Sequence, residues 1–319
     1  MKKFRFGALV LALCLLICSI PALAVQNPDD AGRYQEILSA ERSGRLSAYF
    51  LDLSVNPGAE DKSGDSTLLI APDGTTMLID AGHPDSAPFI IQFLKDMGIS
   101  RIDYLVASHA HIDHIGGIPA VVDAFEIGRL IRNSVEYTTQ TYQNYVQAVE
   151  QKQIPVSVLQ AGDTFEFGSE VKVEIFNPEE PIQYPASFPA NSTQFLNDGS
   201  LVMKFTYGDS TFLFAGDLYL TQEKKLAEKY GELLHADVIK ANHHGNDTSN
   251  GRPWIKATAP KYVVAMNDGM GSMDVYNLYL KKGAQFYQAD FDGIVMVSSD
   301  NAADYSVLTQ YDSWMHPAA

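Results

Sequence analysis

The sequence contains almost no cysteine, which limits how the fold can be stabilised. Both of its cysteines, Cys14 and Cys18, lie in a leading segment over residues 1–24. That segment has a basic start, an apolar run over residues 6–20 and an Ala-x-Ala site, the features of a cleaved signal peptide. The run is shorter than the roughly 20 residues of a membrane span, so an uncleaved anchor is the weaker alternative. We expect a secreted mature chain of about 295 residues, long enough to bury a core without disulfides.

Positive charge is also scarce. The chain has 23 Lys and Arg against 39 Asp and Glu, a net charge of −16, and loss of Lys2, Lys3 and Arg5 with the leading segment makes it −19. The basic clusters are only pairs, at residues 224–225 and 281–282. Such a field repels polyanions, and nonspecific nucleic-acid binders carry basic patches. Composition therefore disfavours nucleic acid as a partner, although a local cleft can be positive. We expect no membrane span in the mature chain.

Histidine is rare but concentrated. Of the eight histidines, three occur with one aspartate within six residues, directly after an apolar strand predicted at 104–107: His109, His111, Asp113 and His114. Imidazole and carboxylate groups at this density suit zinc or a similar divalent ion. Two partners follow downstream, an apolar strand that ends in Gly216-Asp217 and the pair His243-His244. These partners disfavour the alternative of a solvated histidine-rich loop.

The ordered set of motifs resembles the metallo-β-lactamase superfamily. The pattern HxHxDH with Gly116-Gly117, then Gly-Asp, then His-His-Gly carries the resemblance, supported by the pieces at 51–53, 64–66, 78–82 and 197–202. It is most similar to the branch with the hydrolase domain of competence DNA-uptake channels and the phosphorylcholine esterases. The resemblance implies an α/β (α+β) fold, a four-layer αββα sandwich of two mixed sheets flanked by helices, with metals at one sheet edge.

The resemblance also implies a ligand set for two divalent metal ions. His109 and His111 would hold the first metal, Asp113 and His114 the second, and Asp217 would bridge both. One of His243 and His244 would complete the second site. We favour His243, with His244 outside the ligand shell or facing the substrate. At the reacting centre we expect Asp113, His244 and Asn197.

One histidine that is common in the superfamily is absent here. No histidine occurs between Ile115 and Asp217, and Asn197-Asp198-Gly199-Ser200 stands at the corresponding strand start. Either Asp198 or Asn197 substitutes as a metal ligand, or the first metal keeps an open position. Zinc is the expected metal, and manganese can compete at a site of this kind.

Several neighbouring segments are expected to support the site. Asp80 would orient a ligand histidine, and the backbone amides of residues 115–117 would face an anion at a helix start. His83 is more consistent with a surface position than with the cleft, as are His235 and His316. Residues 178–191 contain four prolines, which favours a surface loop over a substrate-gripping flap. A polar insertion at 56–64 would border the site.

The remaining chain is expected to form one domain. We predict a linker at 25–45, with one helical turn at 34–40, and a hydrolase domain at 46–312. Hydrophobic periodicity predicts helices at 88–97, 119–125, 139–152 and 221–230. Strands are predicted at 49–53, 67–71, 76–80, 104–107, 156–159, 164–167, 171–176, 201–207, 211–215 and 238–241. Further strands at 262–265, 286–288, 294–297 and 306–310 would complete the second sheet.

Two cations about 3.5–4 Å apart can hold a hydroxide between them and neutralise a phosphoryl centre. The resemblance implies a phosphoester substrate, most of all a phosphodiester, in a small molecule or a cell-envelope polymer. The alternatives are hydrolysis of another ester or amide bond such as a lactone or β-lactam, an inactive envelope binding protein, and a detached nuclease of DNA uptake. The sequence does not determine the oligomeric state.

Overall fold

The computed structural model describes residues 28–54, 64–182, 192–266, 268–313 and 315. Its first sheet has eight strands in the order β15-β14-β1-β2-β3-β4-β5-β6. The pairs from β15 to β3 are antiparallel and those from β3 to β6 are parallel, so the sheet is mixed. The strands are β1 Leu46–Phe50, β2 Thr67–Ile70, β3 Thr76–Ile79, β4 Arg101–Ala107, β5 Glu126–Arg132, β6 Val156–Val158, β14 Val295–Ser299 and β15 Tyr305–Thr309.

The second sheet is also mixed and has seven strands in the order β13-β12-β11-β10-β9-β8-β7. The pairs from β10 to β13 are parallel and those from β7 to β10 are antiparallel. The strands are β7 Thr164–Phe167, β8 Val171–Asn177, β9 Val202–Tyr207, β10 Ser210–Phe214, β11 Val238–Lys240, β12 Tyr262–Ala265 and β13 Gln285–Gln288.

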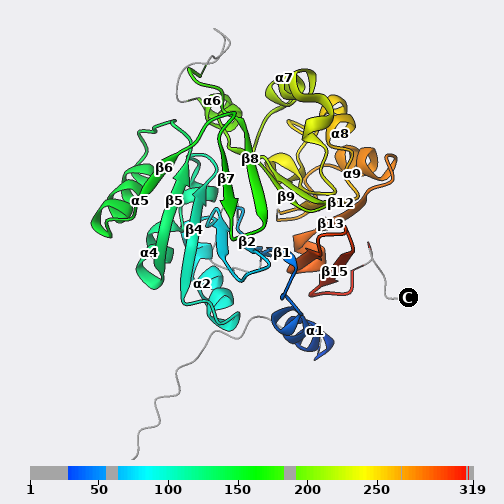
Figure 1. Cartoon of the computed structure of the whole chain (residues 1–319), viewed down its shortest axis with the longest axis horizontal. Helices are drawn as coiled ribbons and strands as arrows, with labels where there is room; N and C mark the ends of the chain where they lie inside the picture. The colour runs from blue at the N-terminus through cyan, green and yellow to red at the C-terminus, as the bar shows by residue number, and fades with distance from the viewer. Residues whose placement is uncertain (1–27, 55–63, 183–191, 267, 314, 316–319) are drawn as a thin grey trace, which may run out of the picture.

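Helices cover the outer face of each sheet. Figure 1 shows α2, α4 and α5 on the side of the first sheet, with α7, α8 and α9 on the side of the second. The larger helices are α1 Pro28–Ser39, α2 Ala87–Asp96, α4 Ile118–Ala124, α5 Gln140–Gln151, α6 Thr193–Asp198, α7 Leu220–Tyr230, α8 Arg252–Thr258 and α9 Met273–Leu280. The single-turn elements are α3 Ile112–Ile115, α10 Ala289–Asp292, η1 Pro84–Ser86, η2 Gly231–Leu234 and η3 Asn242–Gly245. This arrangement confirms the predicted four-layer αββα sandwich.

Three hydrophobic layers hold the sandwich together. Strand β1 contributes to two of these layers, because successive side chains of a strand point to opposite faces. Ala48 and Phe50 point to the layer between the sheets, and Tyr49 points to the layer under the helices. A third layer lies between the second sheet and its own helices, around Trp254 and Phe286. Strands that are buried on both faces read as continuous apolar runs. That property made most of them recognisable in the sequence.

The structure corrects several predicted elements. Strands β14 and β15 belong to the first sheet rather than the second, because β14 pairs antiparallel with β1. Strand β5 was not predicted, since Gly128 and Arg129 interrupt its apolar pattern. Helices α6, α8 and α9 were missed as well. In the predicted linker, α1 is longer than one turn and packs Ile37, which is fully buried, against the core.

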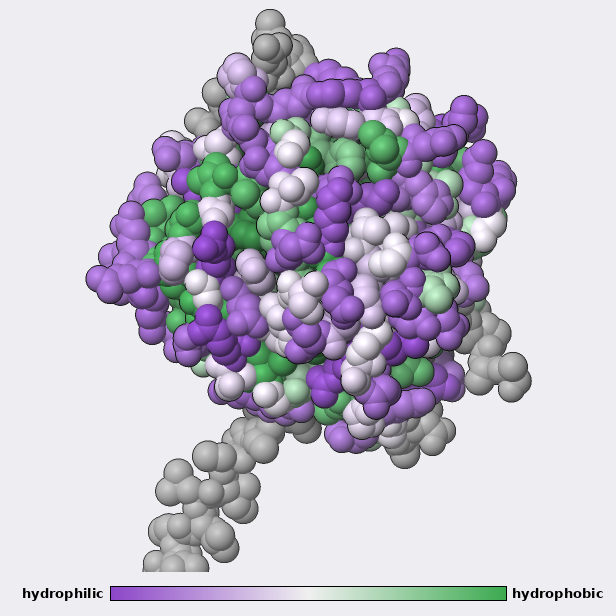
Figure 2. Space-filling view, in the orientation of Figure 1, coloured by the Kyte–Doolittle hydropathy of each residue, from purple (hydrophilic) through white to green (hydrophobic). Residues whose placement is uncertain are grey.

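Some predictions fall on residues that the structure does not describe. They are the signal peptide at 1–24, most of the insertion at 56–64, residues 183–191 of the proline-rich segment predicted as a surface loop, and His316. Among the described residues, no helix is long and apolar enough to cross a membrane. Figure 2 shows a largely hydrophilic face with apolar patches toward β6 and α5. On β6, Val156 and Val158 are 46% and 48% exposed.

Candidate metal centre

The predicted ligands come together because several strands end at the same edge of the sandwich. The His109–His114 motif follows the end of β4, and Asp80 follows the end of the adjacent strand β3. Asp217 and the pair His243-His244 follow the ends of β10 and β11, which are parallel neighbours in the second sheet. The site therefore lies between the ends of two facing sheets.

Asp65 reaches the same edge of the sandwich from the start of a strand rather than from the end of one. It precedes β2, which runs antiparallel to β3, so the start of β2 lies beside the end of β3. The tight turn depends on Gly64, where φ is +80° and an added Cβ would lie 1.8 Å from the Asp113 carbonyl oxygen. Gly216 has the same role before Asp217, with φ +52° and an added Cβ 2.8 Å from the Ser200 hydroxyl oxygen.

The backbone is strained at three residues of the site that are not glycine. Asp80, His243 and His244 have φ values of 61°, 46° and 57°, in the left-handed region that residues other than glycine adopt uncommonly. Strain of this kind persists only where the surrounding structure enforces it, and it clusters at functional sites. Here it turns two consecutive histidines in different directions.

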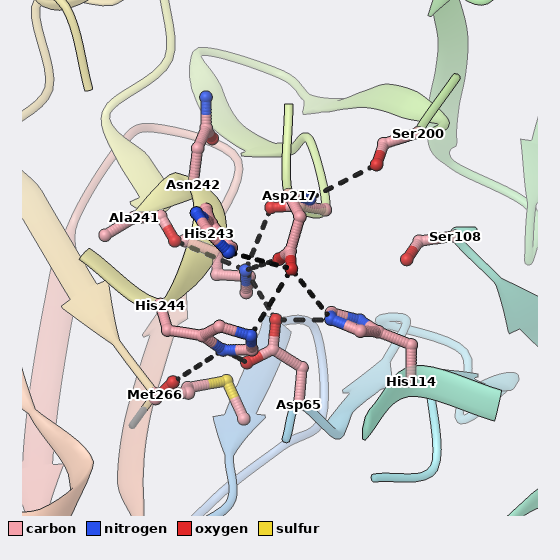
Figure 3. Close-up of polar contacts among 12 residues, drawn as sticks. Asp65, Ser108, His114, Ser200, Asp217, Ala241, Asn242, His243, His244 and Met266 are labelled. Carbon is pink, nitrogen blue, oxygen red and sulfur yellow. Dashed lines mark hydrogen bonds and ion pairs between the residues drawn. The ribbon is translucent and has the colours of Figure 1, made fainter. Parts of the chain in front are cut away.

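The Asp217 carboxylate forms a compact cluster with three other side chains (Figure 3): Asp65, His114 and His244. Asp217 Oδ2 lies 3.2 Å from His114 Nε2 and 3.3 Å from His244 Nε2. Asp113 Oδ2 lies 3.3 Å from the same His244 atom. Ligand atoms about 2.0–2.1 Å from a tetrahedral zinc are about 3.3 Å apart. His114 Nε2 and His244 Nε2 therefore have the spacing from Asp217 Oδ2 of ligands to one cation, and Asp113 Oδ2 has the same spacing from His244 Nε2.

The orientation of both imidazoles favours metal binding. His114 Nδ1 lies 2.8 Å from Asp80 Oδ2, and His244 Nδ1 lies 3.0 Å from Asp65 Oδ1 and from the Met266 carbonyl oxygen. With the proton on Nδ1, each ring presents the lone pair of Nε2 to the cluster. Both Nε2 atoms are buried and make no hydrogen bond with the described residues. Asp80 thus has the orienting position that the sequence predicted.

A second cluster contains His109, His111 and Asp217. His109 Nε2 lies 3.0 Å from His111 Nδ1 and 3.8 Å from Asp217 Oδ2, while Ser108 Oγ lies 3.1 Å from His109 Nδ1. Two nitrogens at this separation can share one cation. Because Asp217 Oδ2 belongs to both clusters, the residues fit a pair of metals bridged by this carboxylate.

The structure separates the two candidate histidines for the second metal. His244 is part of the compact cluster, whereas His243 Nε2 lies 3.9 Å from Asp217 Oδ2 and belongs to neither cluster. His243 Nδ1 is hydrogen-bonded to Thr248 Oγ1, and its ring lies tilted against that of Tyr219, with 5.0 Å between centroids. The geometry favours His244 as the ligand and leaves His243 on the cleft wall, the reverse of the order favoured from sequence.

A cleft of about 470 Å³ opens onto the metal cluster. It is lined by His83, His111, Ile112, Asp113, Thr193, Asn197, Asp217, Tyr219 and His243. His83 therefore lies on the cleft wall rather than on the open surface favoured from sequence. His235 is exposed, as predicted.

The two candidates for the missing ligand also separate. Asn197 is fully buried, lines the cleft, and neither of its amide atoms makes a hydrogen bond with the described residues. Asp198 instead lines a different cavity of about 720 Å³ and belongs to neither metal cluster. Burial raises the pKa of Asp198 to about 6. The structure thus brings Asn197 to the site and leaves Asp198 outside it.

The predicted anion site at residues 115–117 is wrong. The amides of Ile115, Gly116 and Gly117 donate to the carbonyl oxygens of His111, Ile112 and Gly82. These bonds build the single turn of α3 and fix the start of α4 against the β3–α2 connection. No amide of this segment is left to bind an anion.

The electrostatics keep the carboxylates ionised. Burial alone would raise the pKa of Asp113 and Asp217, but the positive charge that the His244 and His114 imidazoles carry while no metal is bound lowers both overall. Burial would likewise lower the pKa of Lys240, but the Asp65 carboxylate beside it raises it. Metal ligands must be deprotonated, so ionised carboxylates suit the site.

Three residues of the site had no predicted role: Asp65, Tyr219 and Lys240. Asp65 lies in a Gly-Asp-Ser segment that carried part of the family resemblance, so a signal for it existed. Lys240 lies three positions before His243 and is 4% exposed, although lysine is rarely buried. Nothing in the local pattern distinguishes Tyr219 from a surface aromatic residue.

Comparison with known proteins identifies the family of this chain. Residues 61–265 match the profile of the metallo-beta-lactamase superfamily. The chain is 25% identical over 240 residues to ComE operon protein 3 of Bacillus subtilis, covering 72% of this chain and 29% of that protein. It is 28% identical over 200 residues to competence protein ComA of Neisseria gonorrhoeae, covering 62% and 25%. The chain thus spans less than a third of the length of these relatives.

Among solved structures, a putative metal-dependent hydrolase from Parabacteroides distasonis is similar, with a TM-score of 0.48, 15% identity, and coverage of 77% of this chain and 93% of that one. The family assignment rests on the profile match, which includes the HxHxDH motif, Asp217 and His243-His244. The chain belongs to the metallo-beta-lactamase superfamily of metal-dependent hydrolases.

Proposed function

We propose that this protein is a secreted phosphodiesterase that uses two divalent metal ions, zinc or manganese. The observation that carries the proposal is the position of Asp217 Oδ2, which lies 3.2–3.8 Å from the Nε2 atoms of three proposed ligand histidines, His109, His114 and His244. A carboxylate oxygen in that position supports a shared bridge between two cations. His109 and His111 would hold one metal, and Asp113, His114 and His244 the other.

Such a pair supplies a water nucleophile at neutral pH and neutralises charge on a phosphoryl group. Residues of the cleft wall would donate a proton to the leaving group and hydrogen-bond to the substrate. His243 Nδ1 is hydrogen-bonded to Thr248 Oγ1 and the ring lines the cleft, where a protonated Nε2 would serve as general acid toward the leaving-group oxygen. The Asn197 amide and the Tyr219 hydroxyl are uncharged groups on the same wall, positioned to hydrogen-bond to the substrate.

An isolated phosphodiester group is a better candidate substrate than a long polyanion such as a nucleic acid. Metal pairs of this type clamp both the attacking and the leaving oxygen of an in-line displacement at phosphorus. The net charge of the whole chain, −16, disfavours long nucleic acids. We therefore infer a small phosphodiester or a phosphodiester of a cell-envelope polymer as the substrate, reached after export directed by residues 1–24.

The test is hydrolysis by purified protein that has been stripped of metal and reloaded with zinc or manganese. The substrates are bis-p-nitrophenyl phosphate, p-nitrophenyl phosphorylcholine and a chromogenic β-lactam. We expect metal-restored cleavage of a phosphodiester that Asp217→Asn abolishes and Asp209→Asn, an exposed hairpin control, retains. Cleavage of the lactam alone would overturn the proposal. Two bound metals with no turnover would favour an inactive binding protein.

A further inference from the structure

A buried lysine lies directly behind the metal cluster. Lys240 is the last residue of β11, and its ammonium group forms an ion pair with Asp65 Oδ2 at 2.5 Å. It also lies 3.7 Å from Asp217 Oδ1 and donates to the carbonyl oxygens of Gly216 and Ala241 at 3.0 and 3.2 Å. A charged group is almost never this deeply buried unless it is paired.

The pairing changes what Asp65 can do. Asp65 is close enough to His114, Asp217 and His244 to act as a ligand to the same cation. Both of its oxygens are engaged elsewhere, however, because Oδ1 accepts from His244 Nδ1 at 3.0 Å and Oδ2 faces Lys240. Asp65 is therefore a carboxylate within reach of the metal whose two oxygens are already paired, one with His244 and the other with Lys240.

Asp217 is restrained in the same way. Lys240 faces its Oδ1 atom, while its Oδ2 atom faces the imidazoles of His114 and His244. The lysine thus favours the orientation in which a single oxygen is available for bridging. Asp65 and Lys240 come from the two different sheets, so this arrangement exists only in the assembled sandwich.

We propose that Lys240 is a positioning residue that determines metal affinity and selectivity by keeping Asp65 out of the ligand set. The inference rests on the metal centre in the proposed function and not on the identity of the substrate. With Lys240 present, the second metal is offered two imidazole nitrogens and two carboxylate oxygens. Without it, Asp65 becomes a third carboxylate ligand and one nearby positive charge disappears.

Both changes have a defined direction. Removing a positive charge next to two cations tightens divalent metal binding. An added carboxylate makes the ligand set harder, which favours manganese more than zinc. A purely structural lysine would behave differently, because its loss would destabilise the metal-free protein without tightening metal binding or changing the ratio of the two affinities.

The experiment measures metal affinity directly. The metal-stripped wild type, Lys240→Met and Lys204→Met are titrated with zinc and with manganese in competition with a chromophoric chelator. Lys204 is a matched control, a half-buried lysine on β9 that donates to the Leu233 carbonyl oxygen. We expect Lys240→Met to bind manganese at least about tenfold more tightly, with a smaller gain for zinc. Unchanged or weaker manganese binding would overturn the proposal, as would an equal gain in Lys204→Met.

A second variant keeps the test informative if Lys240→Met fails to fold, which far-UV circular dichroism would reveal. Asp65→Asn should still bind two metals, because Asp65 is outside the ligand set, and a drop to one metal would overturn the proposal. The double variant Asp65→Asn/Lys240→Met should lose the shift toward manganese. If the wild type bound no metal, the proposed function would be refuted. If the metal affinities of Lys240→Met equalled those of the wild type, only this inference would be refuted.

Discussion

The adjacent histidines His243 and His244 should have separable roles, and exchanging each for asparagine tests this. Asparagine is the suitable replacement because both residues adopt φ values, 46° and 57°, that asparagine tolerates better than alanine. The backbone of the His-His turn is thereby preserved in both variants. The two proteins then differ only in which imidazole is missing.

The structure sets the size of each effect. His244 Nε2 lies 3.3 Å from both Asp113 Oδ2 and Asp217 Oδ2, so its loss removes one of the four ligand atoms of the second metal. Losing an outer partner of a ligand typically costs 10–100-fold in metal affinity, so losing the ligand itself should cost at least about 100-fold, or about 2.8 kcal/mol. His243 is outside both clusters, and its loss should lower kcat about 10²–10⁴-fold, as for a general acid.

The assay combines metal content and turnover. We expect His244→Asn to retain one metal per chain after dialysis and His243→Asn to retain two. Turnover of bis-p-nitrophenyl phosphate should fall in both, with added metal partly restoring only His244→Asn. The opposite pattern of metal loss would refute the geometric argument and return the ligand role to His243.

Three further outcomes test other parts of the site. Asp198→Asn should leave metal content and turnover within about twofold of wild type, because Asp198 faces another cavity; loss of a metal measured by mass spectrometry would contradict its placement. Gly64→Ala should lower the free energy of unfolding by at least about 2 kcal/mol in urea titrations, since its Cβ would lie 1.8 Å from the Asp113 carbonyl oxygen at φ +80°. Burial raises the pKa of Asp52 from 3.8 to about 7, so the stability linked to this group is full below about pH 4 and is lost as the pH rises through 7. Asp52→Asn should therefore reduce this loss of stability by up to about 4 kcal/mol. If the pH dependence of the unfolding free energy were the same in the variant, the pKa of Asp52 would not be raised by burial.

Contiguous motifs carried most of what could be predicted. The ligands of the HxHxDH segment lie within six residues after one apolar strand, so their convergence needs no information from the rest of the chain. Asp217 is recognisable because a glycine and an apolar strand precede it. The buried strands themselves were visible as apolar runs, whereas β5 was hidden by Gly128 and Arg129.

Roles that depend on where a side chain or a backbone amide points, rather than on the residue type, were harder to predict from the sequence. Asn197 and Asp198 are neighbours, yet the end of α6 turns one toward the metal cleft and the other toward a separate cavity. The anion site predicted for residues 115–117 failed because the carbonyl partners of those amides come partly from Gly82, on another segment. Sequence position does not contain this information.

The sequence by itself determined the family, the layered fold and the chemistry of the metal ligands, because those follow from residue types in a fixed order. Only the tertiary structure decided that His244 Nε2 lies closer than His243 Nε2 to Asp217 Oδ2, and that Lys240 pairs with Asp65. The first depends on two consecutive left-handed residues. The second depends on β2 and β11, from different sheets, bringing a carboxylate and an ammonium group within 2.5 Å.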